Sequence, residues 1–345
     1  MRTEPELDCR ALRQHVQACY GLALERLAFL PLGEVSTSYL AHDGRGHAYV
    51  VRLYPQTSRM ARWSVQRMPY YLPLLDRLQR ENPPFALPRP VLTLAGSHVS
   101  RWDGYHVVIT HYIDGRHPEP GDLYGGHLAK RLAETLAWLH QLPREVVRGY
   151  PFCEQFDIPF ASELEQAMAR LGVIGEGARP GQVALRDLLW PRRAWVYGML
   201  EKLRGLAAQA RALDSPLVLC HTDVHALNLL VDDAGRLAIL DWEGAGLAPA
   251  EHDLFMFCGP GFRDFLRLYW ASGGVRDLHP TRFMFYFYRR NLEDLTDWLV
   301  RILWESQTEE QDQLDLQGIM DDCVSQWPHM EATMSEVTDL LGGSA

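Results

Sequence analysis

The chain has 345 residues, enough for one large or two ordinary domains. Acidic residues outnumber basic ones by 44 to 34, which gives a net charge of −10 with the histidines neutral. This balance argues against nucleic-acid binding, which needs a basic surface. It suits a cationic small ligand, although solubility alone also explains a mildly acidic chain.

Cysteine usage and hydropathy predict a cytoplasmic protein that makes no membrane contact. The six cysteines form no CxxC pair and no tight framework, which is typical of reduced thiols. The opening residues, MRTEPELDCR, hold no apolar core that could act as a signal peptide. No apolar run approaches the roughly 18 residues that a membrane helix needs.

The N-terminal third of the chain predicts strands around one helix. Apolar or alternating runs indicate strands within 27–32, 33–42, 47–54 and 105–115. A helix is expected within 59–80, and its two prolines should kink or divide it.

The texture of the sequence changes after Gly115. Leucines at helical spacing predict a helix over 127–142, and a further helix is expected from about 183 to 212. Short strands should follow at LVLC, NLLV and LAIL, and the chain beyond residue 251 should be helical. We therefore predict an α+β protein with a small N-terminal lobe, residues 1–113, and a larger, mainly helical lobe, residues 114–345. A cleft between two lobes is a usual position for a ligand.

The segment LVLCHTDVHALNLLVDDAGRLAILDWE, Leu217–Glu243, concentrates polar chemistry among apolar runs. One interpretation is a zinc site, because His221, Asp223 and His225 alternate along an extended chain. No third histidine cluster or cysteine pair supports it. The more ordinary role for His225 is packing or hydrogen bonding within the loop.

The second interpretation of this segment is phosphoryl transfer. That reaction needs an acid beside the acceptor hydroxyl and oxygen ligands for magnesium. A His-x-Asp-x-x-x-x-Asn loop supplies Asp223 and Asn228, and a strand pair then returns to Asp241. The interval of five residues between Asp and Asn equals that of the kinase catalytic loop.

Three motifs together, HTDVHALNLL, AILDWE and PAEHDLF, resemble the aminoglycoside phosphotransferases, small-molecule kinases with a protein-kinase-like fold. The family pattern is a His-Gly-Asp-x-x-x-x-Asn loop, an Asp-Trp or Asp-Phe pair after apolar residues, and then Asp-Leu about ten residues on. The likeness covers roughly residues 20–305. CHTDVHA and LAPAEHDL are also similar to the spectinomycin phosphotransferase branch.

The resemblance implies a role for each matching residue. Asp223 would be the catalytic base that deprotonates the acceptor hydroxyl. Asn228 and Asp241 would hold Mg²⁺ against the phosphates of ATP or GTP. His221 would support the loop through hydrogen bonds, and Asp253 would anchor the segment that follows Asp241.

The same resemblance places the nucleotide in the N-terminal lobe. THYID matches the hinge between lobes, so backbone groups of His111 and Ile113 should bind the purine. A hydroxyl-rich turn, Ser36, Thr37 and Ser38, should cover the phosphates with its N–H groups.

One position departs from the family pattern. The third strand usually carries a lysine that pairs with the α- and β-phosphates, and Arg52 stands there instead. Lysine and arginine are not interchangeable at such a position. The lysine's usual partner is a helix glutamate, and the matching region, QRMPYY at 66–71, holds no acid. Arg52 should then lack a partner acid and be poorly ordered without nucleotide.

The acceptor should be recognised by acids. Glu293, Asp294 and Asp297 lie close together on one predicted helix and could hold ammonium groups of an amino sugar, or they could form a solvated face. Glu243, two residues after Asp241, is a further candidate for the acceptor.

We thus expect a phosphotransferase that moves the γ-phosphoryl group of a nucleoside triphosphate to a hydroxyl of a small cationic molecule, an aminoglycoside or aminocyclitol. One alternative is a metabolic kinase for choline, homoserine or a sugar. The other, motivated by Arg52, is a nucleotide-binding pseudokinase.

Overall fold

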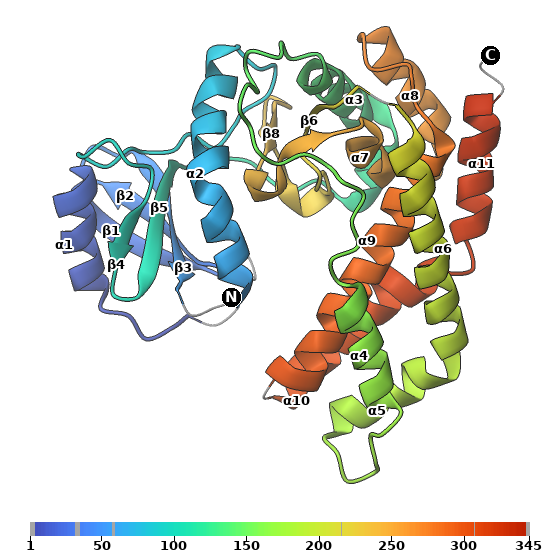
Figure 1. Ribbon diagram of the computed structural model, residues 1–345. Helices are drawn as coiled ribbons and strands as arrows, with labels where there is room; N and C mark the ends of the chain where they lie inside the picture. Colours follow the sequence, from blue (N-terminus) through green and yellow to red (C-terminus); the bar gives the residue numbers. More distant parts are fainter. Residues whose placement is uncertain (1–3, 32–34, 57–58, 215, 307, 343–345) are drawn as a thin grey trace. The chain divides into compact units, whose positions relative to one another are not determined.

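The computed structural model describes residues 4–31, 35–56, 59–214, 216–306 and 308–342 (Figure 1). The chain forms two compact units. The first comprises Met1–Phe152, His221–Gly246 and Arg267–Gly274, and the second comprises Cys153–Cys220, Leu247–Leu266 and Val275–Ala345. The expected lobe boundary at residue 113 falls inside the first unit, and the division into lobes there stays a prediction.

A five-stranded antiparallel sheet with the order β1-β2-β3-β5-β4 forms the N-terminal part of the first unit (Figure 1). The strands are β1 (Leu24–Leu30), β2 (Thr37–Asp43), β3 (Ala48–Pro55), β4 (Ser100–Trp102) and β5 (Tyr105–His111). Strand β3 lies between β2 and β5, so both edges of the segment that carries Arg52 are hydrogen-bonded.

Helix α1 (Cys9–Tyr20) packs against one face of this sheet. The Asp8 carboxylate accepts hydrogen bonds from two N–H groups of the first turn, and Gly21 ends the helix with φ of 70°. The core between helix and sheet consists of Leu12, Val16, Tyr20, Leu24, Tyr39, Ala41, Tyr49, Val51, Leu53, Val107 and Ile109. Helix α1 and strand β4 are not among the predicted elements.

Helix α2 (Arg59–Arg80) is one continuous helix with the predicted limits. Pro69 and Pro73 do not divide it, although each proline removes one backbone hydrogen bond. Met68, Tyr71, Leu72, Leu75 and Leu78 are each at most 5% exposed. Burial of this face offsets the lost hydrogen bonds, so the helix continues through both prolines.

The remainder of the first unit holds the polar segment identified in the sequence. Helix α3 (Gly126–His140) matches its prediction, and β7 (Leu229–Val231) pairs with β8 (Leu237–Ile239) as a hairpin. Isolated bridges from Ala86 to Ala238 and from Arg116 to Val231 attach this hairpin to the chain that enters and leaves the sheet.

The second unit is mainly helical. Its helices are α4 (Ala161–Leu171), α5 (Pro180–Leu189), α6 (Arg193–Ala212), α7 (Glu251–Leu254), α9 (Pro280–Val300), α10 (Glu309–Gly318) and α11 (Met330–Gly342). Helix α8 (Phe262–Ala271) and strand β9 (Gly246–Ala248), which pairs with β6 (Val218–Cys220), contribute residues to both units. The predicted single helix over 183–212 is wrong, because a 3-10 turn that contains Pro191 separates α5 from α6.

These elements confirm the α+β class, with an antiparallel sheet in the N-terminal region and helices in most of the remainder. Across the described ranges, no helix has both the length and the apolar character required to cross a bilayer.

Candidate active site

The β7–β8 hairpin brings the two expected magnesium ligands to the same end of a strand pair. Leu229 lies opposite Ile239, and the Leu240 N–H donates to the carbonyl of Asn228 at 2.8 Å. Asp241 follows Leu240 directly. Antiparallel pairing therefore explains why residues separated by more than a dozen positions in the sequence converge.

The side chain of Asn228 also contacts the expected base. Its Nδ2 donates to the Asp223 carboxylate oxygen Oδ2 and to the Asp223 carbonyl, both at 2.9 Å. Because both contacts use the amide nitrogen, the amide oxygen is directed away from Asp223. An amide oxygen and the Asp241 carboxylate are hard donors of the kind that Mg²⁺ prefers, so this pair of side chains fits a magnesium ion.

His221 is fully buried and bonded to the backbone of the same segment. Its Nε2 donates to the carbonyl of Leu240 at 2.7 Å, and its Nδ1 accepts from the Asp223 N–H at 3.3 Å. Its ring also meets Trp242 edge to face. These contacts agree with a loop-supporting role for His221, and the role itself stays a prediction. They occupy both ring nitrogens, which removes His221 from the alternative zinc site.

His225 lies beside the base. Its Nδ1 accepts from the Leu227 N–H at 3.3 Å, which leaves the proton of the neutral ring on Nε2, 3.4 Å from Asp223 Oδ2. The structure thus gives His225 the hydrogen bonds within the loop that the ordinary interpretation expects.

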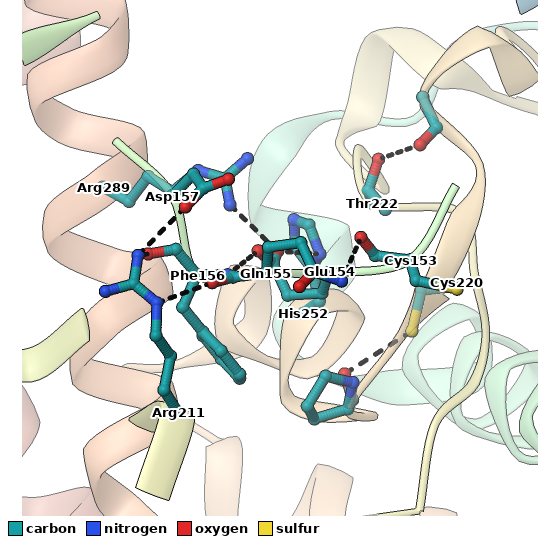
Figure 2. Close-up of polar contacts among 12 residues, drawn as sticks. Cys153, Glu154, Gln155, Phe156, Asp157, Arg211, Cys220, Thr222, His252 and Arg289 are labelled. Atoms are coloured by element: carbon teal, nitrogen blue, oxygen red, sulfur yellow. Dashed lines mark hydrogen bonds and ion pairs between the residues drawn. The ribbon is translucent and has the colours of Figure 1, made fainter. Parts of the chain in front are cut away.

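Two residues in this region have left-handed backbone. Thr222 has φ of 77° and Asp241 has φ of 54°. A β-branched residue at positive φ is a true outlier, and such strain gathers at functional positions. The Thr222 hydroxyl donates to the Gly244 carbonyl at 3.1 Å, and Figure 2 shows this contact at the labelled Thr222.

Arg52 has a partner acid, Asp241, although the sequence predicted none. Its Nη1 lies 2.6 Å from Asp241 Oδ1 and 4.0 Å from Glu243 Oε1. The Asp241 charge raises the pKa of Arg52 well above its ordinary value, against the effect of burial. The expectation of an unpaired arginine is therefore wrong, because the acids come from the loop after β8 and not from helix α2.

Glu243 is held against strand β3. The Tyr54 hydroxyl donates to its Oε1 at 2.5 Å, and the glutamate side chain is only 16% exposed. Burial and the neighbouring Asp241 charge raise the pKa of Glu243, whereas Arg52 and the Tyr54 hydroxyl oppose that rise. Arg52 and Tyr54 are two residues apart in β3, so they point to the same face of the sheet.

Helix α2 contributes an arginine to the loop that carries Glu243. Arg67 donates to the carbonyls of Glu243 at 2.5 Å, Gly244 at 3.1 Å and Ala245 at 2.7 Å. Its guanidinium also stacks 3.7 Å above the Phe152 ring. The segment 66–71 holds no acid, and nothing local in the sequence predicts that Arg67 binds these carbonyls. Tyr54 could have been found from its spacing to Arg52.

The hydroxyl residues proposed to cover the phosphates do not form a turn. Ser36 lies in a bend, but Thr37 and Ser38 begin β2, opposite Leu53 and Arg52. Alternation along β2 turns Thr37 into the core and sets Ser38 on the Arg52 face. The prediction of a turn is wrong at Thr37 and Ser38, because both pair with β3.

The hinge prediction concerns backbone groups. The His111 N–H donates to the Arg89 carbonyl at 2.9 Å, and the Tyr112 N–H donates to the Ala48 carbonyl at 3.0 Å. A purine would therefore meet the carbonyl of His111 and the backbone of Ile113. Purine binding by these two residues stays a prediction.

The remaining predicted residues belong to the second unit. Glu293, Asp294 and Asp297 all lie on α9, as predicted, and Asp294 accepts from Arg290 Nε at 2.8 Å. Partial burial and the charges of Glu293 and Asp294 raise the pKa of Asp297 to about 7, although its side chain remains exposed.

Asp253 is fully buried in α7. Burial, followed by the Asp253 charge, raises the pKa of Cys220 well above its ordinary value. The burial agrees with a structural role for Asp253, and the role itself stays a prediction.

The segment Cys153–Asp157 of the second unit is held by two arginines (Figure 2). Arg211 donates to the carbonyls of Gln155 and Phe156 at 2.8 and 2.7 Å, and Arg289 donates to the Glu154 carboxylate at 2.9 Å. Phe156, inside this segment, has a φ of 55° and is one of five non-glycine residues with positive φ among the residues that the structure describes. No motif in the sequence predicts a role for this segment.

Comparison with known proteins assigns the chain to a class. The profile of the phosphotransferase enzyme family matches residues 26–293. The chain therefore belongs to the phosphotransferase enzyme family, and the predicted resemblance is confirmed. A comparison with curated protein sequences gives no match.

Several solved structures share the fold. A spectinomycin phosphotransferase in complex with ADP and spectinomycin is similar with a TM-score of 0.73 and 17% identity, covering 92% of this chain and 95% of that chain. Macrolide 2'-phosphotransferase MphH from Brachybacterium faecium has a TM-score of 0.55 and 18% identity, with 91% and 98% covered. An ethanolamine kinase from Plasmodium vivax has a TM-score of 0.53 and 15% identity, with 92% and 90% covered. These likenesses confirm the protein-kinase-like fold.

Proposed function

We propose that this phosphotransferase moves the γ-phosphoryl group of ATP or GTP to a hydroxyl of an aminoglycoside or aminocyclitol. The observation that carries the proposal is the cluster of Asp223, Asn228 and Asp241 in the first unit, with Arg52 against Asp241. Phosphoryl transfer depends on positioning and charge stabilisation, and these side chains provide a base, two oxygen donors and a guanidinium.

Each residue has a distinct role in this reaction. Asp223 accepts the proton of the acceptor hydroxyl, while the Asn228 amide and the His225 ring orient its carboxylate. Asn228 and Asp241 would hold Mg²⁺, and the bound ion would neutralise phosphate charge. Arg52 then neutralises charge on the nucleotide with its planar fork of donors.

The acceptor class rests on charge. Glu293 and Asp297 on α9 offer carboxylates to ammonium groups, and the chain as a whole carries a net charge of −10. The spectinomycin phosphotransferase likeness and the CHTDVHA and LAPAEHDL motifs favour an aminocyclitol. All six cysteines lie in described segments and none forms a disulfide, so a cytoplasmic location is part of the proposal.

The test is nucleotide consumption with purified protein, ATP or GTP, Mg²⁺ and a panel of acceptors. The panel holds spectinomycin, several aminoglycosides, choline, homoserine and simple sugars, and the Asp223→Asn variant serves as the control for contaminating kinases. Acceptor-dependent turnover with an aminoglycoside or spectinomycin supports the proposal. Turnover only with choline, homoserine or a sugar would identify a metabolic kinase. Nucleotide binding without turnover on any acceptor would indicate a pseudokinase.

A further inference from the structure

Arg52 lies between two carboxylates that belong to one short turn. Its Nη1 is 2.6 Å from Asp241 and 4.0 Å from Glu243, and a 3-10 turn, Trp242–Gly244, links these acids. A guanidinium presents several N–H groups in one plane, so it can bond to two carboxylates or exchange one for the other with a small movement.

Glu243 needs a cation at this position. Its side chain is largely buried against Tyr54, which is itself only 1% exposed. A buried carboxylate is costly unless it is paired and hydrogen-bonded. Tyr54 supplies the hydrogen bond, and Arg52 is the cation that the structure gives to this carboxylate.

The turn that carries Glu243 is fixed by helix α2. Arg67 donates to two carbonyls of this turn and to the carbonyl of Ala245 directly after it, and it stacks on Phe152. In the family pattern the equivalent helix supplies a glutamate to the strand lysine. Here the helix supplies an arginine that holds the turn, and the turn supplies the glutamate.

We propose that Glu243 is a positioning residue that holds the Arg52 guanidinium toward the nucleotide phosphates once Asp241 is committed to Mg²⁺. Arg52 pairs with Asp241 when no metal is bound, and it pairs with Glu243 when Asp241 has become a metal ligand. This inference rests on the proposed function. The sequence suggested that Glu243 contacts the acceptor, whereas this inference gives Glu243 a role in nucleotide binding.

The test is calorimetric titration of ADP into wild type and Glu243→Gln, once with Mg²⁺ and once with EDTA. We expect the dissociation constant for magnesium ADP to rise about 10-fold in Glu243→Gln, the scale of one hydrogen bond to a charged group. In EDTA the two proteins should bind ADP alike, because Arg52 then stays on Asp241. A variant that merely damaged the fold would lose affinity under both conditions.

A double-mutant cycle ties the effect to Arg52. Combining Arg52→Ala with Glu243→Gln should weaken magnesium ADP binding no further than Arg52→Ala alone. Tyr54→Phe, which removes the hydroxyl that holds Glu243, should shift affinity in the same direction by a smaller factor, and it serves if Glu243→Gln does not fold. Glu134→Gln, at an exposed carboxylate of α3, is the matched control and should bind like wild type.

The outcomes separate this inference from the proposed function. If wild type binds no magnesium ADP, the phosphotransferase proposal fails and the inference fails with it. If wild type binds but Glu243→Gln binds equally well or more tightly, only the positioning role is overturned. Unchanged ADP affinity together with a raised KM for the acceptor would show that Glu243 acts in acceptor binding and would overturn the positioning role.

Discussion

The Asn228 side-chain amide donates to the Asp223 carboxylate at 2.9 Å, so the expected magnesium ligand also orients the expected base. Asp223→Asn keeps the shape of this side chain but removes its capacity to accept a proton. We expect turnover to fall by about 100-fold or more, the range of general-base catalysis. The dissociation constant for magnesium ADP should change little. Steady-state kinetics on the acceptor found in the panel, together with calorimetry, measure both quantities. Wild-type turnover in this variant would remove Asp223 from the role of base.

The ion pair between Arg52 and Asp241 predicts a stability effect in the protein without nucleotide. Arg52→Ala leaves Asp241 and Glu243 together without their cation, and the partly exposed position reduces the cost to about 1–2 kcal/mol. Arg52→Lys should recover part of this loss, because an ammonium group still lies between two acids. Chemical denaturation measures the free energy of unfolding. Arg62→Ala, at an exposed position of α2, is the control, and equal losses in all three variants would contradict the pairing.

The close approach of Gly244 to Thr222 predicts a paired substitution effect. A Cβ at residue 244 would lie 2.5 Å from Thr222 Oγ1, so Gly244→Ala must displace the hydroxyl from its hydrogen bond to the Gly244 carbonyl. We expect a loss of about 1–3 kcal/mol in stability, typical of overpacking. Adding Thr222→Ala should restore part of this loss, since the obstructing oxygen is then gone. Thermal denaturation of the single and double variants measures these losses. Purely additive losses in stability would show that the two residues do not interact.

The raised pKa of Asp297 predicts a pH dependence of stability. Its pKa is about 7 in the folded protein and near 3.8 in the unfolded chain, so the folded state binds more protons between these values. The free energy of unfolding should therefore fall as pH rises from 4 to 7. Asp297→Asn should remove this contribution and be more stable than wild type at pH 8. Because the side chain is exposed, the difference should not exceed about 1 kcal/mol.

Denaturation at pH 4, 6 and 8 provides the check. Wild type and Asp297→Asn should differ least at pH 4, close to the pKa of the aspartate in the unfolded chain, because Asp297 is then protonated in the folded state and about half protonated in the unfolded one. A constant difference at every pH would show that the substitution acts through packing and not through charge.

Much of the candidate site could be predicted because its polar residues lie close together in the sequence at a recognisable spacing. Asp223, Asn228 and Asp241 lie within 19 residues, and the apolar runs between them predict the hairpin that brings Asn228 and Asp241 together. The sheet strands and α3 follow from hydrophobic alternation and helical periodicity in the same way.

The partner of Arg52 could not be predicted, because it lies 189 residues away in the sequence. Tertiary contacts of that range leave no local pattern in the sequence. The left-handed backbone at Thr222 was equally hidden, since threonine normally avoids positive φ.

The wrong predictions of helix boundaries arise where proline and the hydrophobic pattern favour different structures. Pro69 and Pro73 lie inside a helix whose buried face outweighs two lost hydrogen bonds, whereas Pro191 coincides with a break between helices. A proline alone does not determine the result, because the packing of the surrounding residues decides whether the helix continues. The signals for α1 were present in the Asp8 cap and the Gly21 terminus, but its three buried positions formed a short pattern.

The acids beside Arg52 lie in the loop after β8 and not on helix α2, and this position affects how related sequences should be searched for. A motif filter that demands a strand lysine and a helix glutamate would discard this chain as inactive. Yet one cation and two carboxylates meet at Arg52, Asp241 and Glu243 in this chain. A search that scores the net charge around the Asp241 position, instead of fixed letters, would keep chains whose ionic partners occupy other positions in the sequence.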